Sequence, residues 1–158
     1  MEYATQITTL TQAFYNAYPQ AQYPEIPTKQ SRPYKCMLLE THDGYFICLP
    51  FRTNIRHRYA FTFGNNRSRK KANPGIDISK MIIITEPSYI SDSFAIVKKS
   101  EYNETMAHLD TIVNRADQYL QSYINHVLGN IVLSEPEFSR KYGHSCLPYF
   151  HKELGLDK

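Results

Sequence analysis

The pair Asp43-Gly44 separates two apolar runs, and this short signal constrains the fold of the chain more than any other. Asp-Gly between two strand-like runs is typical of a tight β-hairpin. The pattern therefore predicts antiparallel strands at 34–39 and 45–49, joined by a turn at 42–44. An antiparallel sheet is then the framework that the rest of the chain must cover.

Further strands are predicted on the C-terminal side of this hairpin. The segment 58–63 alternates aromatic residues with smaller ones, which is the period of a strand with one buried face. The segment 81–84 is an uninterrupted apolar run of strand length, and a short strand is expected at 94–97. These strands would extend the hairpin into a larger sheet.

Helical periodicity flanks the predicted strands. Apolar residues recur at helical spacing from Ile7 to Tyr18, which predicts an N-terminal amphipathic helix that ends before Pro19. Ser100 is expected to cap a long helix that ends at Gly129. The apolar stripe of this long helix comprises Tyr102, Met106, Leu109, Val113, Ala116, Leu120, Ile124 and Val127.

A last short helix is predicted after Ser134, because Pro136 suits a first helical turn. The proline-rich stretch 19–33 is expected to form a surface arm. The order helix, strands, long helix, short helix indicates an α+β fold. With 158 residues the chain has the usual length of one domain, so a single domain over residues 1–158 is expected.

Cysteine usage and hydropathy indicate a soluble cytoplasmic protein that does not associate with membranes. The cysteines Cys36, Cys48 and Cys146 match neither a disulfide framework nor a zinc spacing, and the first two lie in apolar runs where a buried thiol is expected. The first residues lack a signal-peptide pattern, and no run approaches the ~18 apolar residues of a membrane span.

The formal net charge is only +3, but the basic residues are unevenly distributed. No Asp or Glu occurs from residue 44 to residue 76, whereas seven of the 18 Lys and Arg residues occupy the 20 positions from 52 to 71. A mildly acidic body with one basic segment is the footprint of a polyanion-binding site. The alternative, a solvated loop that happens to be basic, applies above all to residues 67–71.

Aromatic residues are interleaved with these cations, which favours RNA among the polyanions. Tyr34 and Tyr59 are expected to stack on unpaired bases, while the cations contact phosphates. The expected RNA-binding set is Tyr34, Arg56, Arg58, Tyr59, Arg67, Arg69, Lys70, Lys71 and Lys80.

Cleavage of RNA without a metal requires a base, an acid and cations beside the phosphate. His57 is the histidine of the basic segment, and histidine is the usual proton-transfer residue near neutral pH. Thr53 can position a phosphate or relay a proton, and Arg52, Arg56 and Lys35 can hold phosphate oxygens. An exposed loop histidine and a turn-capping threonine are the structural alternatives for His57 and Thr53.

The acids do not predict a metal site. Asp43 is a turn residue, and Asp77 stands alone in the sequence. Asp77 is expected to cap a turn with Ser79 or to pair with an arginine. No cofactor is therefore expected. Three histidines outside the basic segment are expected to be structural or exposed: His126, His144 and His151.

Several short segments, taken in order, resemble one toxin family. They are Arg32-Pro33-Tyr34, Leu49-Pro50-Phe51-Arg52-Thr53-Asn54, His57, Pro74-Gly75-Ile76-Asp77-Ile78-Ser79-Lys80 and Tyr89-Ile90. Over roughly residues 32–128 the chain resembles the endoribonuclease toxins of type III toxin–antitoxin systems, in the ToxN/AbiQ superfamily and closest to its TenpN branch.

The resemblance implies a fold, a reaction and partners. The fold is a compact, strongly bent antiparallel sheet, an SH3-like barrel similar to MazF and Kid, with a long helix and shorter terminal helices. The reaction is metal-independent cleavage of cellular or phage RNA to 2′,3′-cyclic phosphate and 5′-hydroxyl ends. The partner is a repeated, pseudoknotted antitoxin RNA that the toxin processes, often within a closed hetero-oligomer, and some members act in phage defence.

The resemblance also implies catalytic positions. The family's catalytic hydroxyl corresponds to Thr53, and Arg52 stands where many members carry a second hydroxyl. The family's basic residue at the start of the first strand corresponds to Arg32 or Lys35. Two further hypotheses remain open: a non-catalytic RNA-binding module on the same sheet, and a MazF-like ribonuclease toxin neutralised by a protein antitoxin.

Overall fold

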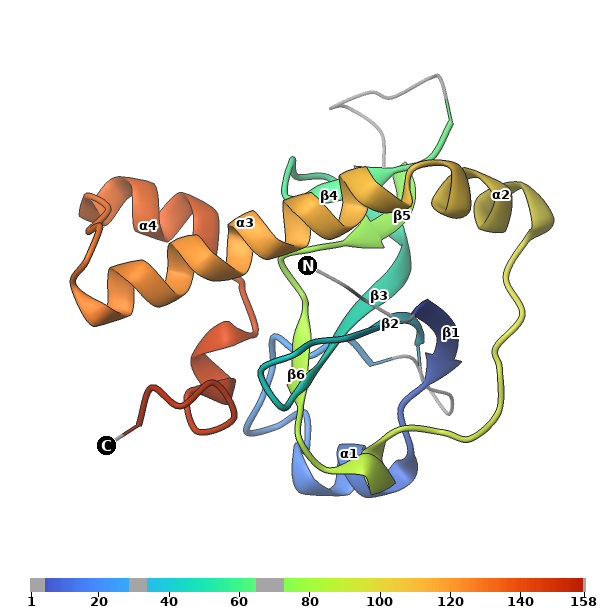
Figure 1. The fold of residues 1–158 in the computed structure, drawn as a ribbon, viewed down its shortest axis with the longest axis horizontal. Coiled ribbons are helices and arrows are strands. Elements are labelled where there is room, and N and C mark those ends of the chain that lie inside the picture. Colours follow the sequence, from blue (N-terminus) through green and yellow to red (C-terminus); the bar gives the residue numbers. More distant parts are fainter. Residues whose placement is uncertain (1–4, 29–33, 65–72, 158) are drawn as a thin grey trace.

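The computed structural model describes residues 5–28, 34–64 and 73–157, and it has an α+β fold. Six strands form one antiparallel sheet with helices packed around it, as expected (Figure 1). The strand order is β1-β2-β3-β5-β4, and β6 also pairs with β3. Among the described strands no ladder joins β1 to β4, so the sheet is not closed into a barrel.

The hairpin at the centre of the sheet forms as predicted. β2 (Lys35–Glu40) pairs with β3 (Phe46–Ile55), with Cys36 opposite Pro50 and Glu40 opposite Phe46. Gly44 has a φ of 87° in the connecting turn, a conformation that costs glycine little. β3 is longer than the predicted segment 45–49, because its second half pairs with a strand from later in the chain.

That later strand, β5 (Asn73–Asp77), was not predicted, because proline and glycine are depleted in strands. Gly75 is what allows β5 to lie between β3 and β4 (Ala60–Thr62). A Cβ atom at Gly75 would collide with the Phe61 carbonyl oxygen and lie 2.8 Å from the Cα of Thr62. β4 is also shorter than the predicted segment 58–63.

β3 takes part in two ladders on the edge that faces β5 and β6 (Ile82–Ile84). Its first half pairs with β6, its second half pairs with β5, and the second ladder shifts register between Arg52 and Ile55. Residues 78–81 connect β5 to β6 outside both ladders. This connection carries Ser79 and Lys80, two of the polar residues described in the next subsection.

The prediction of an N-terminal helix over residues 7–18 is wrong in its first half. Residues Thr5–Thr9 form strand β1, which pairs with β2, and only Gln12–Ala17 form helix α1. Ile7 and Phe14 are both buried, so the apolar residues do face the core, from a strand and then from a helix. Consecutive β-branched residues such as Thr8 and Thr9 favour the strand.

The long helix is also interrupted. α2 (Lys99–Ala107) ends at His108 and α3 (Leu109–Leu128) begins at the next residue, with Lys98 rather than Ser100 at the N-cap. Thr105 is buried, and its hydroxyl donates to the Glu101 carbonyl over 2.7 Å, a side-chain bond that bends helices. Gly129 ends α3 with a φ of 78°, as predicted.

Helix α4 (Glu135–Tyr142) follows with Ser134 as its N-cap, as predicted. Figure 1 shows α3 crossing β4 and β5, with α4 packed beside the C-terminal half of α3. Two short 3-10 helices, η1 (Pro87–Tyr89) and η2 (Leu147–Phe150), flank this layer in the sequence. The strand predicted at 94–97 is absent, and Phe94 and Ile96 are exposed there.

One hydrophobic core joins the sheet to α1, α3, α4 and η2. The three cysteines are buried and unpaired, as expected for Cys36 and Cys48. Burial raises the pKa of the Cys36 and Cys146 thiols to about 12, so these sulfurs stay protonated and uncharged. Within the described ranges, no helix combines the length and the apolar character needed to cross a membrane.

Candidate functional site

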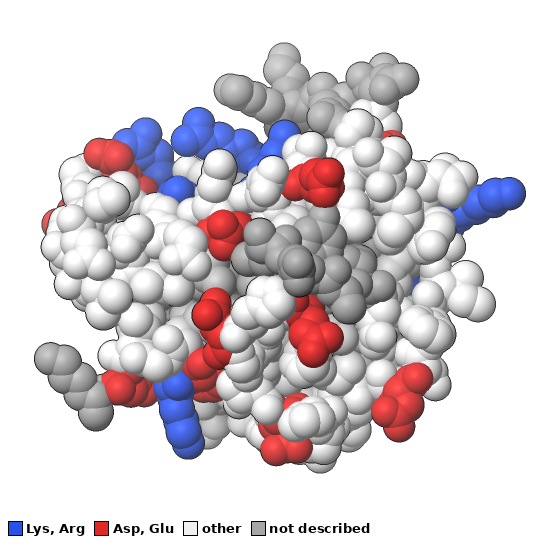
Figure 2. Space-filling model, viewed as in Figure 1, with Lys and Arg blue, Asp and Glu red and all other residues white. Residues whose placement is uncertain are grey.

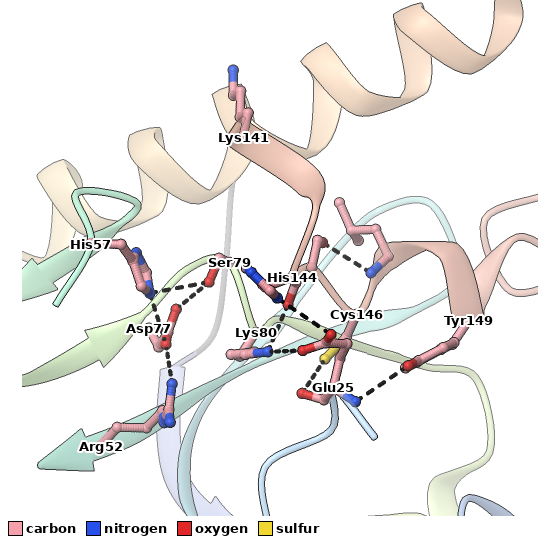
Figure 3. A network of polar contacts seen from close by, with 12 residues as sticks. Glu25, Arg52, His57, Asp77, Ser79, Lys80, Lys141, His144, Cys146 and Tyr149 are labelled. Atoms are coloured by element: carbon pink, nitrogen blue, oxygen red, sulfur yellow. Dashed lines mark hydrogen bonds and ion pairs between the residues drawn. The ribbon is translucent and has the colours of Figure 1, made fainter. Parts of the chain in front are cut away.

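A buried carboxylate, Asp77, is the centre of the polar cluster at the end of β5 (Figure 3). The Arg52 guanidinium donates to Oδ2 over 2.7 Å, and His57 Nε2 lies 3.1 Å from the same oxygen. The Ser79 hydroxyl donates to Oδ1 over 2.6 Å. We call Arg52, His57, Asp77 and Ser79 the Asp77 cluster.

Local backbone geometry explains why these four residues meet. Arg52 lies opposite Gly75 at the register shift of β3, and Asp77 follows two residues later on β5. The backbone N–H of Ser79 donates to the Tyr59 carbonyl over 3.0 Å, which fixes the turn that carries His57. The cluster therefore depends on the change of partner along β3, which pairs first with β6 and then with β5.

The hydrogen bonds of His57 define its tautomer. The backbone N–H of Tyr59 donates to Nδ1 over 3.0 Å, so Nδ1 carries no proton. The ring proton is then on Nε2, which faces Asp77 Oδ2 and lies 3.3 Å from the Ser79 hydroxyl. His57 is a neutral donor to Asp77 in this arrangement, with both ring nitrogens occupied.

Asp77 is held in its charged form. Burial by itself would raise the pKa of this carboxyl, but the hydrogen bonds from His57, Ser79 and Arg52 lower it below its ordinary value. A buried carboxylate without such partners would be strongly unfavourable. The prediction that Asp77 bonds Ser79 or pairs with an arginine is confirmed in both parts.

Only the cationic side of the cluster reaches solvent. The side chains of Arg52 and His57 are 24% and 35% exposed, whereas Asp77 is fully covered. An anion that approaches from solvent therefore contacts the Arg52 guanidinium and the His57 imidazole, and the buried Asp77 carboxylate fixes the orientation of both groups. Such a pair can bind a phosphate, and the histidine can exchange a proton with it.

The loop after β3 carries the other sequence-predicted residues that lie near this cluster. Arg56 and Arg58 are exposed, and the Arg58 guanidinium lies over the Tyr59 ring at 5.2 Å from its centroid. The rings of His57 and Tyr59 are stacked, with centroids 6.3 Å apart. Thr53 is exposed on β3, directly after Arg52.

Two of the predicted cations have other partners. The Lys35 ammonium, at the start of β2, donates to the Ile96 carbonyl and makes no described contact with the Asp77 cluster. Lys80 donates to Glu25 over 2.8 Å and to the His144 carbonyl over 2.7 Å, with a side chain only 12% exposed. Lys80 thus fastens the proline-rich arm to the C-terminal segment instead of facing solvent.

Of the remaining predicted site residues, the structure describes only Tyr34. Tyr34 is half-buried just before β2. Five cations lie outside the described residues: Arg32, Arg67, Arg69, Lys70 and Lys71.

The histidines expected to be structural or exposed are so. His144 is 89% exposed and lies 3.5 Å from Glu25. His151 and His126 bond Tyr123 and the Leu133 backbone, respectively. Lys80 and His144 together lower the pKa of Glu25, although burial alone would raise it.

The sequence predicts a structural role for Asp77 but does not predict that Asp77 joins Arg52 to His57. The available signal was its position: Asp77 is the first acid after a long acid-free stretch and lies between Ile76 and Ile78. A carboxylate flanked by two buried isoleucines has to find cationic partners, and the preceding segment supplies them.

From α3, the Arg115 guanidinium donates to the Ala60 carbonyl over 3.2 Å. No signal in the sequence of α3 indicates this contact.

Among residues 5–28, 34–64 and 73–157, no group of three or more His, Cys, Asp or Glu side chains is arranged to hold a metal ion. Comparison of the chain with protein-family models, with curated proteins and with solved structures finds no significant match. The assignment of function therefore depends on the site and on the ordered sequence segments alone.

Proposed function

We propose that this protein is a metal-independent endoribonuclease toxin of a type III toxin–antitoxin system, acting in the cytoplasm and held inactive by a repeated antitoxin RNA that it processes. The observation that carries the proposal is the pair Arg52 and His57 on one oxygen of buried Asp77, open to solvent on the cationic side. The family resemblance, including a bent and barrel-like sheet and a closed hetero-oligomer with RNA, is part of the same proposal.

The proposed reaction is attack of a ribose 2′-oxygen on the adjacent phosphorus. The new bond is between that oxygen and phosphorus, and the bond to the 5′-oxygen breaks. The 2′-hydroxyl loses its proton and the leaving 5′-oxygen gains one, so the ends are a 2′,3′-cyclic phosphate and a 5′-hydroxyl.

In this reaction His57 accepts the 2′ proton at Nδ1, which first has to leave the exposed bond to the Tyr59 amide. Asp77 then stabilises the imidazolium through Nε2–H, as carboxylates do in other acid–base pairs. Arg52 neutralises charge on the phosphorane. Thr53, the residue that corresponds to the family's hydroxyl, positions the phosphate or relays a proton from water to the leaving 5′-oxygen.

A second function is favoured by a specific observation. Both nitrogens of His57 are occupied and Arg52 is already paired, which is also what a rigid, non-catalytic RNA-binding surface would look like. That function predicts tight RNA binding with no change in RNA length. A MazF-like toxin with a protein antitoxin would instead cut RNA and be neutralised by a protein.

The deciding experiment is expression under a tightly controlled promoter, followed by mapping of RNA ends in the cell. The proposal expects growth arrest, new 5′-hydroxyl ends, and relief of both by a short repetitive RNA supplied in trans. Cleavage by the purified protein should persist in EDTA, since the proposed steps use only side chains. Binding without new ends would refute the nuclease, and relief only by a protein would refute the type III assignment.

A further inference from the structure

Three cations form a band on the surface beside the Asp77 cluster. Arg58 comes from the loop before β4, Arg115 from α3 and Lys141 from α4. We call these three residues the cation band. None was grouped with the others from the sequence, because they belong to three separate elements.

Each cation of the band lies over an aromatic ring. The distances from the charged group to the ring centroid are 5.2 Å for Arg58, 5.7 Å for Arg115 and 5.5 Å for Lys141. The rings are those of Tyr59, Phe61 and Tyr142, respectively. A ring attracts the cation by its face and takes up none of its N–H donors in strong hydrogen bonds.

Tyr119 on α3 makes the band continuous. Its buried ring lies 5.9 Å from the Tyr59 ring on one side and 5.9 Å from the Lys141 ammonium on the other. Its hydroxyl donates to the Lys141 carbonyl over 2.8 Å. Arg115 lies one helical turn before Tyr119 and bonds the Ala60 carbonyl, so the three cations follow one path from loop to helix layer.

The cations of the band are not ion-paired within the described residues. In the part of the chain that the structure describes, no salt bridge joins Arg58, Arg115 or Lys141 to a carboxylate. Figure 2 shows Lys and Arg side chains gathered along the upper edge of this face, from α4 towards β4. Spaced cations with free donors suit a chain of phosphates.

We propose that the cation band binds the phosphate backbone of single-stranded RNA and directs that strand to the Asp77 cluster. This inference rests on the proposed function and adds the helix layer to its substrate surface. The stacked rings of His57 and Tyr59 connect the Arg58 end of the band to the cluster. Of the rings along the band only that of Tyr59 is half-buried rather than buried, so it is the ring that an unpaired base can contact, and this favours single-stranded RNA over duplex.

The test compares two double variants that remove the same charge. Arg115→Gln/Lys141→Gln alters the band, whereas Lys99→Gln/Lys152→Gln alters exposed lysines at the start of α2 and near the C-terminus. Binding of a fluorescent, unstructured RNA of about 16 nucleotides is followed by anisotropy over a range of KCl concentrations. The band variant is expected to lower the slope of log K against log salt by about 1.4, or about 0.7 per lost contact.

Equal slopes for the two double variants would overturn the inference while leaving the proposed nuclease intact. Arg115→Lys/Lys141→Arg keeps both charges and should retain the wild-type slope, which separates loss of charge from loss of folding. Band-dependent binding without any cleavage would support the band and count against the nuclease. Absence of RNA binding by the wild-type protein would overturn both.

Discussion

His57 Nε2 lies 3.1 Å from the buried Oδ2 of Asp77, while the opposite ring nitrogen accepts a backbone N–H. The imidazole is thereby held in one tautomer and one orientation, with its edge towards solvent. The same carboxylate oxygen also accepts a hydrogen bond from the Arg52 guanidinium over 2.7 Å. One buried charge therefore orients two exposed cationic or titratable groups, and this relationship yields the first predictions.

Asp77→Asn should destabilise the protein, because it removes the only charge that compensates Arg52 within the cluster. Breaking a buried ion pair by removing one partner costs about 3–5 kcal/mol, and the partial exposure of Arg52 favours the low end of that range. Urea denaturation measures the change. Asp43→Asn, an equal change of charge in the exposed hairpin turn, is the control and should stay within about 0.5 kcal/mol of wild type. Similar losses for both variants would contradict the prediction.

Stability should fall on acidification through the titration of Asp77. Its pKa in the folded protein is lowered, so the carboxylate stabilises the fold above its unfolded pKa of about 3.9, and this contribution is lost as pH falls through the lower folded value. Thermal unfolding between about pH 5 and pH 2.5 measures it. The Asp77→Asn variant should show a smaller decline in Tm over that window, and identical declines would rule out Asp77 as the source.

Thr53→Ala and His57→Ala should each remove growth inhibition while the protein still folds and binds RNA. Loss of a proton-transfer group typically lowers the rate ~10²–10⁴-fold, which is enough to make a toxin tolerable. Growth after induction and the rate of RNA cleavage are the measurements. Thr111→Ala and His144→Ala, both at exposed positions, are matched controls and should stay toxic. If both site variants remain fully toxic, the catalytic residues lie elsewhere.

The basic residues at 67–71 can be tested although they lie outside the described residues. Replacing Arg67, Arg69, Lys70 and Lys71 together by Ala should weaken RNA binding across sequences and flatten its salt dependence by about 0.7 per lost phosphate contact. Anisotropy titrations at several salt concentrations measure both quantities. Unchanged affinity and slope would show that these four residues are only solvated.

Gly75→Ala should destabilise the sheet, because a Cβ atom at this position collides with the Phe61 carbonyl oxygen. The obstacle is backbone, so β4 and β5 have to move apart, at a cost of at least about 1–3 kcal/mol. Gly64→Asn is the comparison. Gly64 has a φ of 84° but nothing within 4 Å of an added Cβ, so this variant introduces a side chain without a collision. A Gly75→Ala variant as stable as wild type would show that the two strands separate without cost.

Local signals were sufficient for several elements of the fold. The hairpin at Asp43-Gly44, the end of α3 at Gly129 and the start of α4 after Ser134 all formed where the sequence predicted them. Each depends on the conformational preference or hydrogen bonding of one or two residues and their neighbours in the chain. Such preferences can be read without knowing what the segment packs against.

The errors occurred where a distant segment outweighed a local preference. Ile7 and Phe14 share a helical spacing, yet pairing with β2 made the first part of that segment a strand. Pro74 and Gly75 disfavour a strand, yet β5 forms between β3 and β4, where glycine permits the close approach. Long-range backbone pairing stabilises a segment more than its own propensity opposes it.

The sequence by itself determined the materials of the candidate site: an acid-free basic segment with one histidine, interleaved aromatic residues, and a solitary Asp77 between isoleucines. Only the tertiary structure decided which of them meet. Lys35 and Lys80 bond other partners. Arg52 and His57 both contact Asp77. Arg115 and Lys141 lie in one band with Arg58. The physical reason is that a buried carboxylate selects its partners by distance and geometry in three dimensions, which spacing along the chain does not specify.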